Sequence, residues 1–334
     1  MEKNMIEHQG VRVCINCGSD DAKVMHSFTR NWLIEARQTP IERLDELGID
    51  DDFSSSIVKC NKCGCGYIRD VLESRERNSE WDEETLKERL SVYQGGFSRK
   101  QVNHIIYYEY SIISNLLNLV LRKKKDQSNL SLLDFGSSFS ILSPMARVMG
   151  FSDVVAYDPL YPTNISKITP DNHPINFEFL SNMEDIKARA PYDAIICQSA
   201  DEHFYDLQGE IKNIHNLLSD DGVVFWSHPV MDLDADINLL RNEANISDKG
   251  TLKRLRATFH VHHLNYVMPK MFKGMLKRNG FREAKVIMLD KRIAGENRFS
   301  LANIKLLSIS LIKYFLGIIG SSYRKNEFFL EKSR

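Results

Sequence analysis

The sequence lacks an excess of charge of either sign and lacks any segment that repeats at a fixed period. Its 334 residues carry 44 Lys and Arg against 45 Asp and Glu, which gives a formal net charge of −1 at pH 7. This balance excludes a general electrostatic attraction to nucleic acid or to an anionic membrane surface. The missing period excludes repeat architectures such as solenoids and propellers. What remains is an ordinary globular composition, long enough for one full-sized core and one smaller unit.

The first residues do not predict a secretion signal. The first ten residues, MEKNMIEHQG, contain no apolar run of the kind that such signals require. We therefore expect a cytoplasmic protein in a reducing environment. Under those conditions the six cysteines indicate metal ligands or free thiols before disulfides.

One long apolar segment, residues 301–320, needs a separate decision about membranes. Lys305, Lys313 and Asn303 interrupt it, so a membrane span is not expected. We expect a C-terminal helix that packs on its own domain or on a second subunit, in a monomer or a homodimer. Peripheral membrane contact through 301–320 stays open as the alternative.

Four of the six cysteines form two C-x-x-C pairs, Cys14 with Cys17 and Cys60 with Cys63. Two intervening residues let one tight turn present both thiolates, and structural zinc takes four ligands in a tetrahedron. The 42 residues between the pairs exceed the usual ribbon spacing, but they include a predicted helix in TPIERLDELG. The pattern predicts a structural Zn²⁺ site, with free thiols or a redox pair as alternatives.

The charge around these cysteines argues against a module that binds nucleic acid. Residues 1–75 carry ten Lys and Arg against thirteen Asp and Glu, the wrong sign for a surface that binds phosphates. The basic run RKKK, residues 122–125, follows a long helical stretch and is predicted to be its C-terminus. We therefore expect no nucleic-acid partner.

From residue 130 onward, short apolar runs alternate with helical segments. This alternation predicts an α/β fold, a doubly wound and mostly parallel Rossmann-like sheet. In such sheets ligands bind at the carboxyl ends of the strands. Four residues are expected at that edge: Gly136, Asp158, Asn182 and Gln198.

The stretch LLDFGSSFS, which contains Gly136, resembles the end of a strand followed by a ligand-binding turn. Asp158 follows Gly136 by 22 residues and could accept hydrogen bonds from a ribose, or could instead cap a helix or turn before Pro159. The turn lacks the G-x-G-x-x-G run that a pyrophosphate needs. The pattern therefore suits an adenosine-type ligand without a pyrophosphate.

With these motifs the chain resembles the class I S-adenosylmethionine-dependent methyltransferases. Their loop, helix and acid-terminated strand are similar to LLDFGSSFSILSPMARVMGFSDVVAYDP, and their next strands to YDAIICQSADEHFYDLQGEIKNIHNLLSDDGVVFWSHP. The segment HHLNYVMPKMFKGMLKRNGF and the pattern CINCG…CNKCGCGY resemble a subgroup with an N-terminal zinc-binding module. That subgroup includes sugar C-methyltransferases and enzymes of polysaccharide and natural-product pathways.

The resemblance implies roles for individual residues. On the methyl-donor side it implies that Asp134, Gly136 and Ser138 line the methionine part and that Asp158 holds the ribose. It also implies that the adenine lies near Pro159, Asn182 and Met183. The sulfonium would lie near Gln198 and Ser199. Ser138 and Ser140 replace glycines of the family loop, which leaves a non-catalytic scaffold as an alternative.

Histidines are the candidates for a general base, because their pKa lies near neutrality. His263 aligns with the subgroup's H-L-x-Y/F histidine, and His203 lies in ADEHF after the fourth strand of the family. The residues before His263 lack the tyrosine and glutamate of the sugar C-methyltransferases, and a purely structural histidine is the alternative for His263.

Together these features predict a methyltransferase that acts on a small molecule, with a sugar or sugar-nucleotide intermediate as the expected acceptor. A nucleic-acid methyltransferase is a further alternative. Four regions are expected: a zinc-binding module with a helical insertion (1–75), a helical linker and cofactor lid (76–127), a Rossmann-like methyltransferase domain (128–292) and a C-terminal helical extension (293–334).

Overall fold

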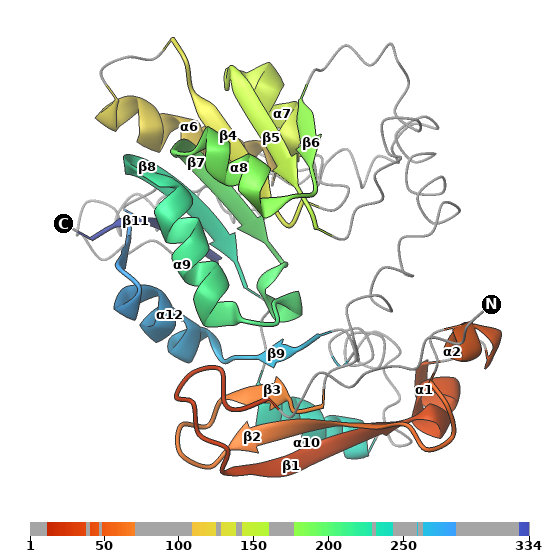
Figure 1. Cartoon of the computed structure of the whole chain (residues 1–334). Coiled ribbons are helices and arrows are strands. Elements are labelled where there is room, and N and C mark those ends of the chain that lie inside the picture. The colour runs from red at the N-terminus through yellow and green to blue at the C-terminus, as the bar shows by residue number, and fades with distance from the viewer. Residues whose placement is uncertain are drawn as a thin grey trace, which may run out of the picture. The chain divides into compact units, whose positions relative to one another are not determined.

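The structure, a computed structural model, describes residues 12–37, 41–46, 49–70, 109–124, 128–137, 142–159, 177–228, 232–242, 259, 263–284 and 327–333. These residues fall into two compact units, whose elements Figure 1 labels. Unit 1 draws on Met1–Glu80, Asp201–Glu210 and Pro229–Met275, and unit 2 on Trp81–Ala200, Ile211–His228 and Leu276–Arg334. The four regions expected from the sequence stay a prediction.

Unit 1 is built on a four-stranded antiparallel sheet with the strand order β1-β2-β3-β9. Its strands are β1 (Ala22–Thr29), β2 (Ser54–Cys60), β3 (Gly66–Ile68) and β9 (Asn265–Tyr266). The helices with them are α1 (Arg30–Arg37), α2 (Ile41–Glu46), α10 (Leu233–Arg241) and the 3-10 turn η4 (Asp201–His203). The helix predicted in TPIERLDELG is therefore present as α2.

The last strand of this sheet comes from a distant part of the chain, and one glycine makes room for it. Gly66 of β3 pairs with Tyr266 of β9. A Cβ on Gly66 would lie 2.5 Å from Leu233 Cδ2 and 2.9 Å from the Tyr266 carbonyl oxygen. Any larger residue would push β9 and α10 away. The core between sheet and helices holds Met25, Phe28, Leu33, Leu44, Ile49, Phe53, Ile57, Ile68, Leu233, Ile237, Leu240, Phe259, Leu264 and Tyr266.

Unit 2 is built on a seven-stranded sheet with the order β10-β11-β8-β7-β4-β5-β6. The five strands from β8 to β6 run parallel, and β11 and β10 join antiparallel at the other side. The strands are β4 (Ser131–Phe135), β5 (Asp153–Tyr157), β6 (Glu178–Leu180), β7 (Tyr192–Gln198), β8 (Leu218–Ser227), β10 (Phe281–Glu283) and β11 (Glu327–Lys332). The predicted α/β fold with a mostly parallel sheet is confirmed.

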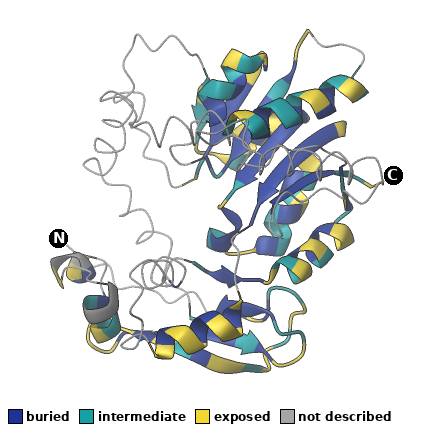
Figure 2. Ribbon diagram, turned by 180° about the vertical axis from the view of Figure 1, so that it is seen from behind, coloured by how far each residue is buried: buried dark blue, intermediate teal, exposed yellow. Residues whose placement is uncertain are grey.

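Helices cover both faces of this sheet, α6 and α7 on one and α8 and α9 on the other (Figure 1). They are α6 (Tyr110–Lys123), α7 (Leu142–Met149), α8 (Met183–Arg189) and α9 (Leu207–Leu217), and α12 (Pro269–Arg278) precedes β10 in the chain. Figure 2 shows the central parallel strands as dark blue along most of their length, as expected for strands covered on both faces, whereas the edge strand β6 has no buried residue. The core that packs α6 and α7 on the sheet includes Ile112, Leu116, Val120, Leu132, Leu142, Ala146, Ala194, Ile196, Val223, Phe225 and Phe329.

Two predictions from the sequence concern the ends of helices and membranes. Arg122 and Lys123 occupy the last turn of α6, so the basic run ends a helix as expected. Within the residues that the structure describes, no helix is long and apolar enough to cross a membrane. The segment 301–320 lies outside the described residues.

The strand order places a topological switch point between β4 and β7. After β4 the chain adds β5 and then β6 on one side, and it then crosses to add β7 and β8 on the other. Helices leave the sheet in opposite directions at such a point, which opens a crevice at the carboxyl ends of the strands. This is the position where a ligand is expected.

Candidate functional site

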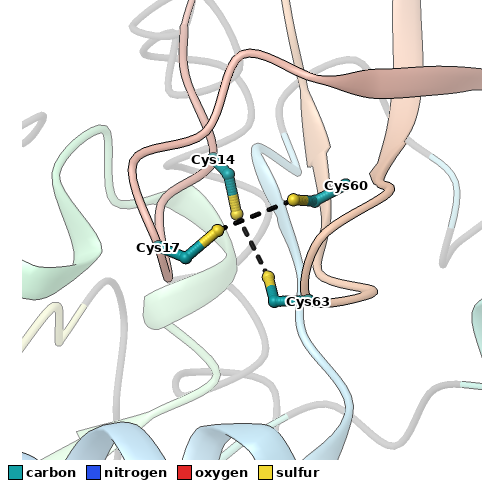
Figure 3. Close-up of side chains that lie close together, drawn as sticks. All are labelled: Cys14, Cys17, Cys60 and Cys63. Carbon is teal, nitrogen blue, oxygen red and sulfur yellow. Dashed lines mark hydrogen bonds between the residues drawn. The ribbon is translucent and has the colours of Figure 1, made fainter.

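The four cysteines of the two C-x-x-C pairs come together in unit 1. Cys14 and Cys17 lie on a turn before β1, and Cys60 and Cys63 lie at the end of β2 and in the turn after it. Figure 3 shows the four thiols pointing toward one another. The Sγ atoms of Cys14 and Cys63 are 3.4 Å apart and those of Cys17 and Cys60 are 3.6 Å apart.

These distances suit a tetrahedral metal ion. With zinc–sulfur bonds of about 2.3 Å, a tetrahedron places its sulfur atoms about 3.8 Å apart. All four Sγ atoms lie within 4.8 Å of one another, so a small adjustment would seat the ion. Gly18 and Gly64 follow the two pairs at φ +69° and +77°, a backbone conformation that glycine adopts without strain. The residues present therefore fit the zinc site that their spacing predicts.

The ionisation of the thiols points the same way. A hydrogen bond with the Cys65 thiol is the largest cause that lowers the pKa of Cys14 to about 4. Burial raises the pKa of Cys63 to about 12, and it also raises the pKa of Cys17. Without a metal ion, the cluster therefore favours the thiolate of Cys14 and disfavours the thiolates of Cys17 and Cys63. A divalent cation is the charge that would let all four cysteines ionise.

In unit 2, the carboxyl ends of β4 and β5 meet at Gly136. The amides of Gly136 and Ser137 both donate to the Tyr157 carbonyl, at 2.8 and 3.0 Å. Asp158 follows directly, is half-buried, and donates its own amide to the Leu180 carbonyl at 3.2 Å. These bonds bring the turn after β4 beside Asp158, as the sequence predicts for a ligand-binding edge.

β7 reaches the same edge. A Cβ on Gly136, whose φ is +71°, would lie 2.6 Å from the Cβ of Ala200, so only glycine lets the turn after β4 approach the end of β7. Ser199, one residue earlier, has φ +50°, which is strained for a residue with a side chain. Gln198 is half-buried and Ser199 is exposed, so both side chains are accessible at this edge.

Other predicted donor-site residues have structural partners as well. Asp134 is 2% exposed and accepts a hydrogen bond from the Ser143 hydroxyl at 2.8 Å, which ties β4 to the start of α7. Asn182 caps α8 by accepting from the Glu184 amide at 3.0 Å, and Met183 is the first residue of that helix. Ser138 and Ser140 lie outside the described residues. Pro159 is exposed after Asp158.

The two candidate bases form a pair within unit 1. The rings of His203 and His263 stand edge to face, with centroids 4.8 Å apart and planes at 80°. Glu202, a residue that is 5% exposed, lies beside them, and the possible ligand atoms of all three residues fall within 4.8 Å of one another. Two imidazoles and a carboxylate can share a proton, and the same set offers donor atoms that a divalent cation accepts.

Three residues of this region were missed by sequence reasoning. Glu202 could have been found, because it precedes His203 in the Glu-His segment. Arg12 and Asn265, which connect the cysteine and histidine regions by hydrogen bonds, gave no local signal. An isolated arginine and an isolated asparagine reveal their partners only once the chain is folded.

Comparison with known protein families gives one match. A family model described as a methyltransferase domain matches residues 103–285, which is more than half of the chain. Comparison with curated protein sequences gives no match. The matched range contains the carboxyl ends of the parallel strands of unit 2, and it contains His203 and His263.

Several solved structures are similar at low identity. A 1,6-didemethyltoxoflavin N1-methyltransferase from Burkholderia thailandensis, with S-adenosylhomocysteine bound, is 13% identical over 86% of this chain and 98% of that chain, with a TM-score of 0.41. Magnesium protoporphyrin IX methyltransferase from Synechocystis PCC 6803 is 12% identical over 64% and 91%, with a TM-score of 0.42. PKMT2 from Rickettsia typhi is 12% identical over 68% of this chain and 53% of that chain, with a TM-score of 0.39. This chain therefore spans about half the length of PKMT2.

Proposed function

The chain belongs to the methyltransferase domain family, and from this premise we propose that it transfers a methyl group from S-adenosylmethionine to a small-molecule acceptor. The observation that supports this most is the convergence of Gly136, Asp158 and Ala200 at the switch point of the unit 2 sheet. We also propose that Zn²⁺ is a structural ion held by Cys14, Cys17, Cys60 and Cys63.

The proposed donor site uses side chains and amides of the carboxyl edge. Asp158 accepts hydrogen bonds from the ribose hydroxyls, and the tight turn at Gly136 leaves room for the methionine part. Asp134 holds that turn in place through Ser143. The remaining assignments are Ser138 on the methionine part, Pro159, Asn182 and Met183 around the adenine, and Gln198 and Ser199 beside the sulfonium.

When bound, S-adenosylmethionine supplies an electrophilic methyl group on a sulfonium that leaves as a neutral thioether. The protein has to align the acceptor atom with that methyl group and to accept the acceptor's proton. We assign the proton to an imidazole nitrogen of His263. His203 and the buried Glu202 orient and polarise that ring.

Chain connectivity supports this assignment. Five residues lead from Gln198, at the end of β7, to His203. An extended chain of that length reaches at most about 18 Å. His203, the first member of the pair, therefore belongs to the chain segment that directly continues the proposed donor edge.

For the acceptor, we infer a sugar or sugar-nucleotide intermediate of polysaccharide or natural-product biosynthesis, on the resemblance of HHLNY and the paired C-x-x-C motifs to the sugar C-methyltransferase subgroup. A non-catalytic scaffold of the same fold is the second candidate, because Ser138 and Ser140 replace glycines of the family loop. A nucleic-acid methyltransferase is disfavoured by the acidic balance of residues 1–75.

The test is release of S-adenosylhomocysteine, measured by mass spectrometry, with nucleoside-diphosphate sugars and small phenols as acceptor panels. The His263→Gln variant should lose about 10²–10⁴-fold in kcat, the range for a general base. The matched control is His215→Gln, a histidine of α9 in unit 2. Turnover that survives in His263→Gln would refute the assigned base. Turnover that stops when a chelator removes a second metal, beyond the zinc of the cysteines, would assign the histidine pair to metal binding instead.

A further inference from the structure

Unit 1 contains a buried hydrogen-bond network centred on Arg12, a residue that is 6% exposed. Its Nη1 donates to the carbonyl oxygens of Ile68 at 3.2 Å and Leu264 at 3.0 Å. Its Nη2 donates to the Tyr205 carbonyl at 2.8 Å and to Asn265 Oδ1 at 2.9 Å. One guanidinium thus joins β3, β9 and the segment that follows η4.

One end of the network is the cysteine cluster. Arg12 stands two residues before Cys14, and its amide donates to the Arg69 carbonyl at 3.0 Å. Ile68, its first acceptor, ends the strand that follows Cys63. A metal ion that holds the two C-x-x-C turns together would therefore fix both the backbone of Arg12 and the strand it binds.

The other end is the histidine pair. Asn265 Nδ2 donates to the carbonyl oxygens of Asp201 and Phe204, both at 2.7 Å, and these two residues flank Glu202 and His203. The Leu264 amide donates to the Glu202 carbonyl at 2.6 Å. Because Leu264 and Asn265 directly follow His263, these bonds set the distance between the two imidazoles.

We propose that Arg12 and Asn265 are positioning residues that make the geometry of the His203–His263 pair depend on the metal-loaded cysteine cluster. The proposal rests on the proposed function in two respects, that the pair serves the acceptor and that the four cysteines hold a metal ion. A guanidinium is a planar fork of five donors, and its four acceptors here lie on three different segments. A lysine ammonium cannot reach all of them with the same geometry.

The consequence for the reaction follows from the precision that catalysis requires. A displacement of about 1 Å in a reacting group can cost about 100-fold in rate. Without the Arg12 and Asn265 bonds, the turn that carries His203 and the strand after His263 share only the Leu264–Glu202 backbone bond among the bonds described above. We expect the pair to separate while the donor edge of unit 2 keeps its own bonds.

The test compares Arg12→Met and Arg12→Lys with the control Arg69→Met. Arg69 belongs to the same unit, and its side chain donates to the Ala22 carbonyl at 3.1 Å rather than to any acceptor of the Arg12 guanidinium. The primary readout is the nuclear Overhauser effect between the His203 and His263 ring protons, assigned with His203→Gln and His263→Gln. Zinc content, affinity for S-adenosylmethionine and kcat are measured on the same samples.

In both Arg12 variants we expect the ring-to-ring signal to disappear and kcat to fall about 100-fold, with zinc content and donor affinity unchanged. The Arg69→Met control keeps all four. Removing zinc from the unaltered protein should abolish the ring-to-ring signal as well. A signal that persists in Arg12→Met with full zinc content, or that persists after zinc removal, overturns the proposal.

A variant that loses zinc outright would not discriminate, so Asn265→Ala provides the second test. It removes the bonds to Asp201 and Phe204 and leaves the Arg12 bonds to Ile68 and Leu264 in place. Loss of the ring-to-ring signal with zinc retained supports the network, and an unchanged signal overturns it. The ring-to-ring signal can be measured without turnover. If the protein transfers no methyl group, the proposed function is refuted, but the signal still tests this inference.

Discussion

Different interactions stabilise the interior of each of the two units. Unit 2 has a wide parallel sheet whose central strands are buried on both faces, so its stability comes mainly from apolar burial. Unit 1 draws its small sheet from two separated chain segments, and it adds a cysteine cluster and a buried arginine to its core. Unit 1 therefore adds to its apolar core a few polar contacts that can each be removed, whereas unit 2 spreads its stability over many apolar contacts.

The largest expected effect is the loss of the zinc ion that we propose for unit 1. Binding of structural zinc is worth about 10–16 kcal/mol in small zinc-binding peptides, and that free energy is folding free energy. Cys14→Ser should abolish stoichiometric zinc and lower the hydrogen-exchange protection of β1–β3 to that of unfolded chain, with β4, β7 and β8 still protected. The matched control is Cys197→Ala, the buried cysteine of β7, which should keep its zinc. Equal loss of protection in both units would show that they do not differ as described.

A smaller effect is expected at the donor edge of unit 2. Gly136→Ala places a Cβ 2.6 Å from Ala200 Cβ and also forces a side chain to φ +71°. We expect a loss of about 1–3 kcal/mol in the free energy of unfolding and weaker donor binding. Gly150→Ala is the control, because its φ is +120° but its Cβ would meet nothing within 4 Å. Should the two variants bind the donor equally well, the close approach of β4 and β7 would have no role in the site.

The next prediction concerns an ion pair of unit 2 whose carboxylate is buried. Lys124 Nζ lies 2.6 Å from Asp193 Oδ1, and the other carboxylate oxygen accepts from the Ser131 amide at 3.0 Å. Asp193→Asn should cost about 1–2 kcal/mol in urea unfolding, because a buried hydrogen-bonded carboxylate is lost. Glu184→Gln breaks an exposed pair with Lys187 and should cost less than about 0.5 kcal/mol. Similar costs for both would mean that burial does not decide the strength of these pairs.

The smallest effect is a pH dependence of unit 2 at His215. Burial, the largest cause, lowers the pKa of His215 below its ordinary value. A lowered pKa means that the unfolded chain binds the proton more readily, so stability is full above about pH 6.5 and falls as the pH drops below it. Thermal unfolding between pH 7.5 and about pH 5 should show a steeper loss for the unaltered protein than for His215→Gln. Parallel curves would remove His215 as the source.

The parts of the molecule that could be predicted from the sequence are those with local patterns. Alternating apolar runs and helices predicted the parallel sheet of unit 2, and the C-x-x-C spacing predicted a cluster that the folded chain brings together. The start of β8 was not predicted, because Tyr192 pairs with Leu218 and Ala194 with Val223, and the residues between Leu218 and Val223 have no partner of their own in β7. A register shift depends on the neighbouring strand, which a local pattern does not report.

The candidate site also contains residues that local sequence patterns predict and residues that they do not. The residues at strand ends follow from strand order, so Gly136 and Asp158 could be placed together in advance. The network from Arg12 to Asn265 spans 253 positions of the chain and has no sequence period. Single polar residues of this kind are visible only as buried donors and acceptors in the folded structure. Glu202 falls between the two cases, since its neighbour His203 drew attention to its segment.

The most direct test of the central claim is calorimetry of the zinc-loaded protein with S-adenosylmethionine and S-adenosylhomocysteine. The Asp158→Ala variant is compared with Asp153→Ala, which removes an exposed carboxylate at the opposite end of the same strand. We predict binding at about micromolar Kd that Asp158→Ala weakens at least about tenfold, roughly 1.4 kcal/mol, and that Asp153→Ala leaves unchanged. Absence of binding at millimolar ligand, or equal binding in both variants, would contradict the assignment of unit 2 as the methyl-donor site.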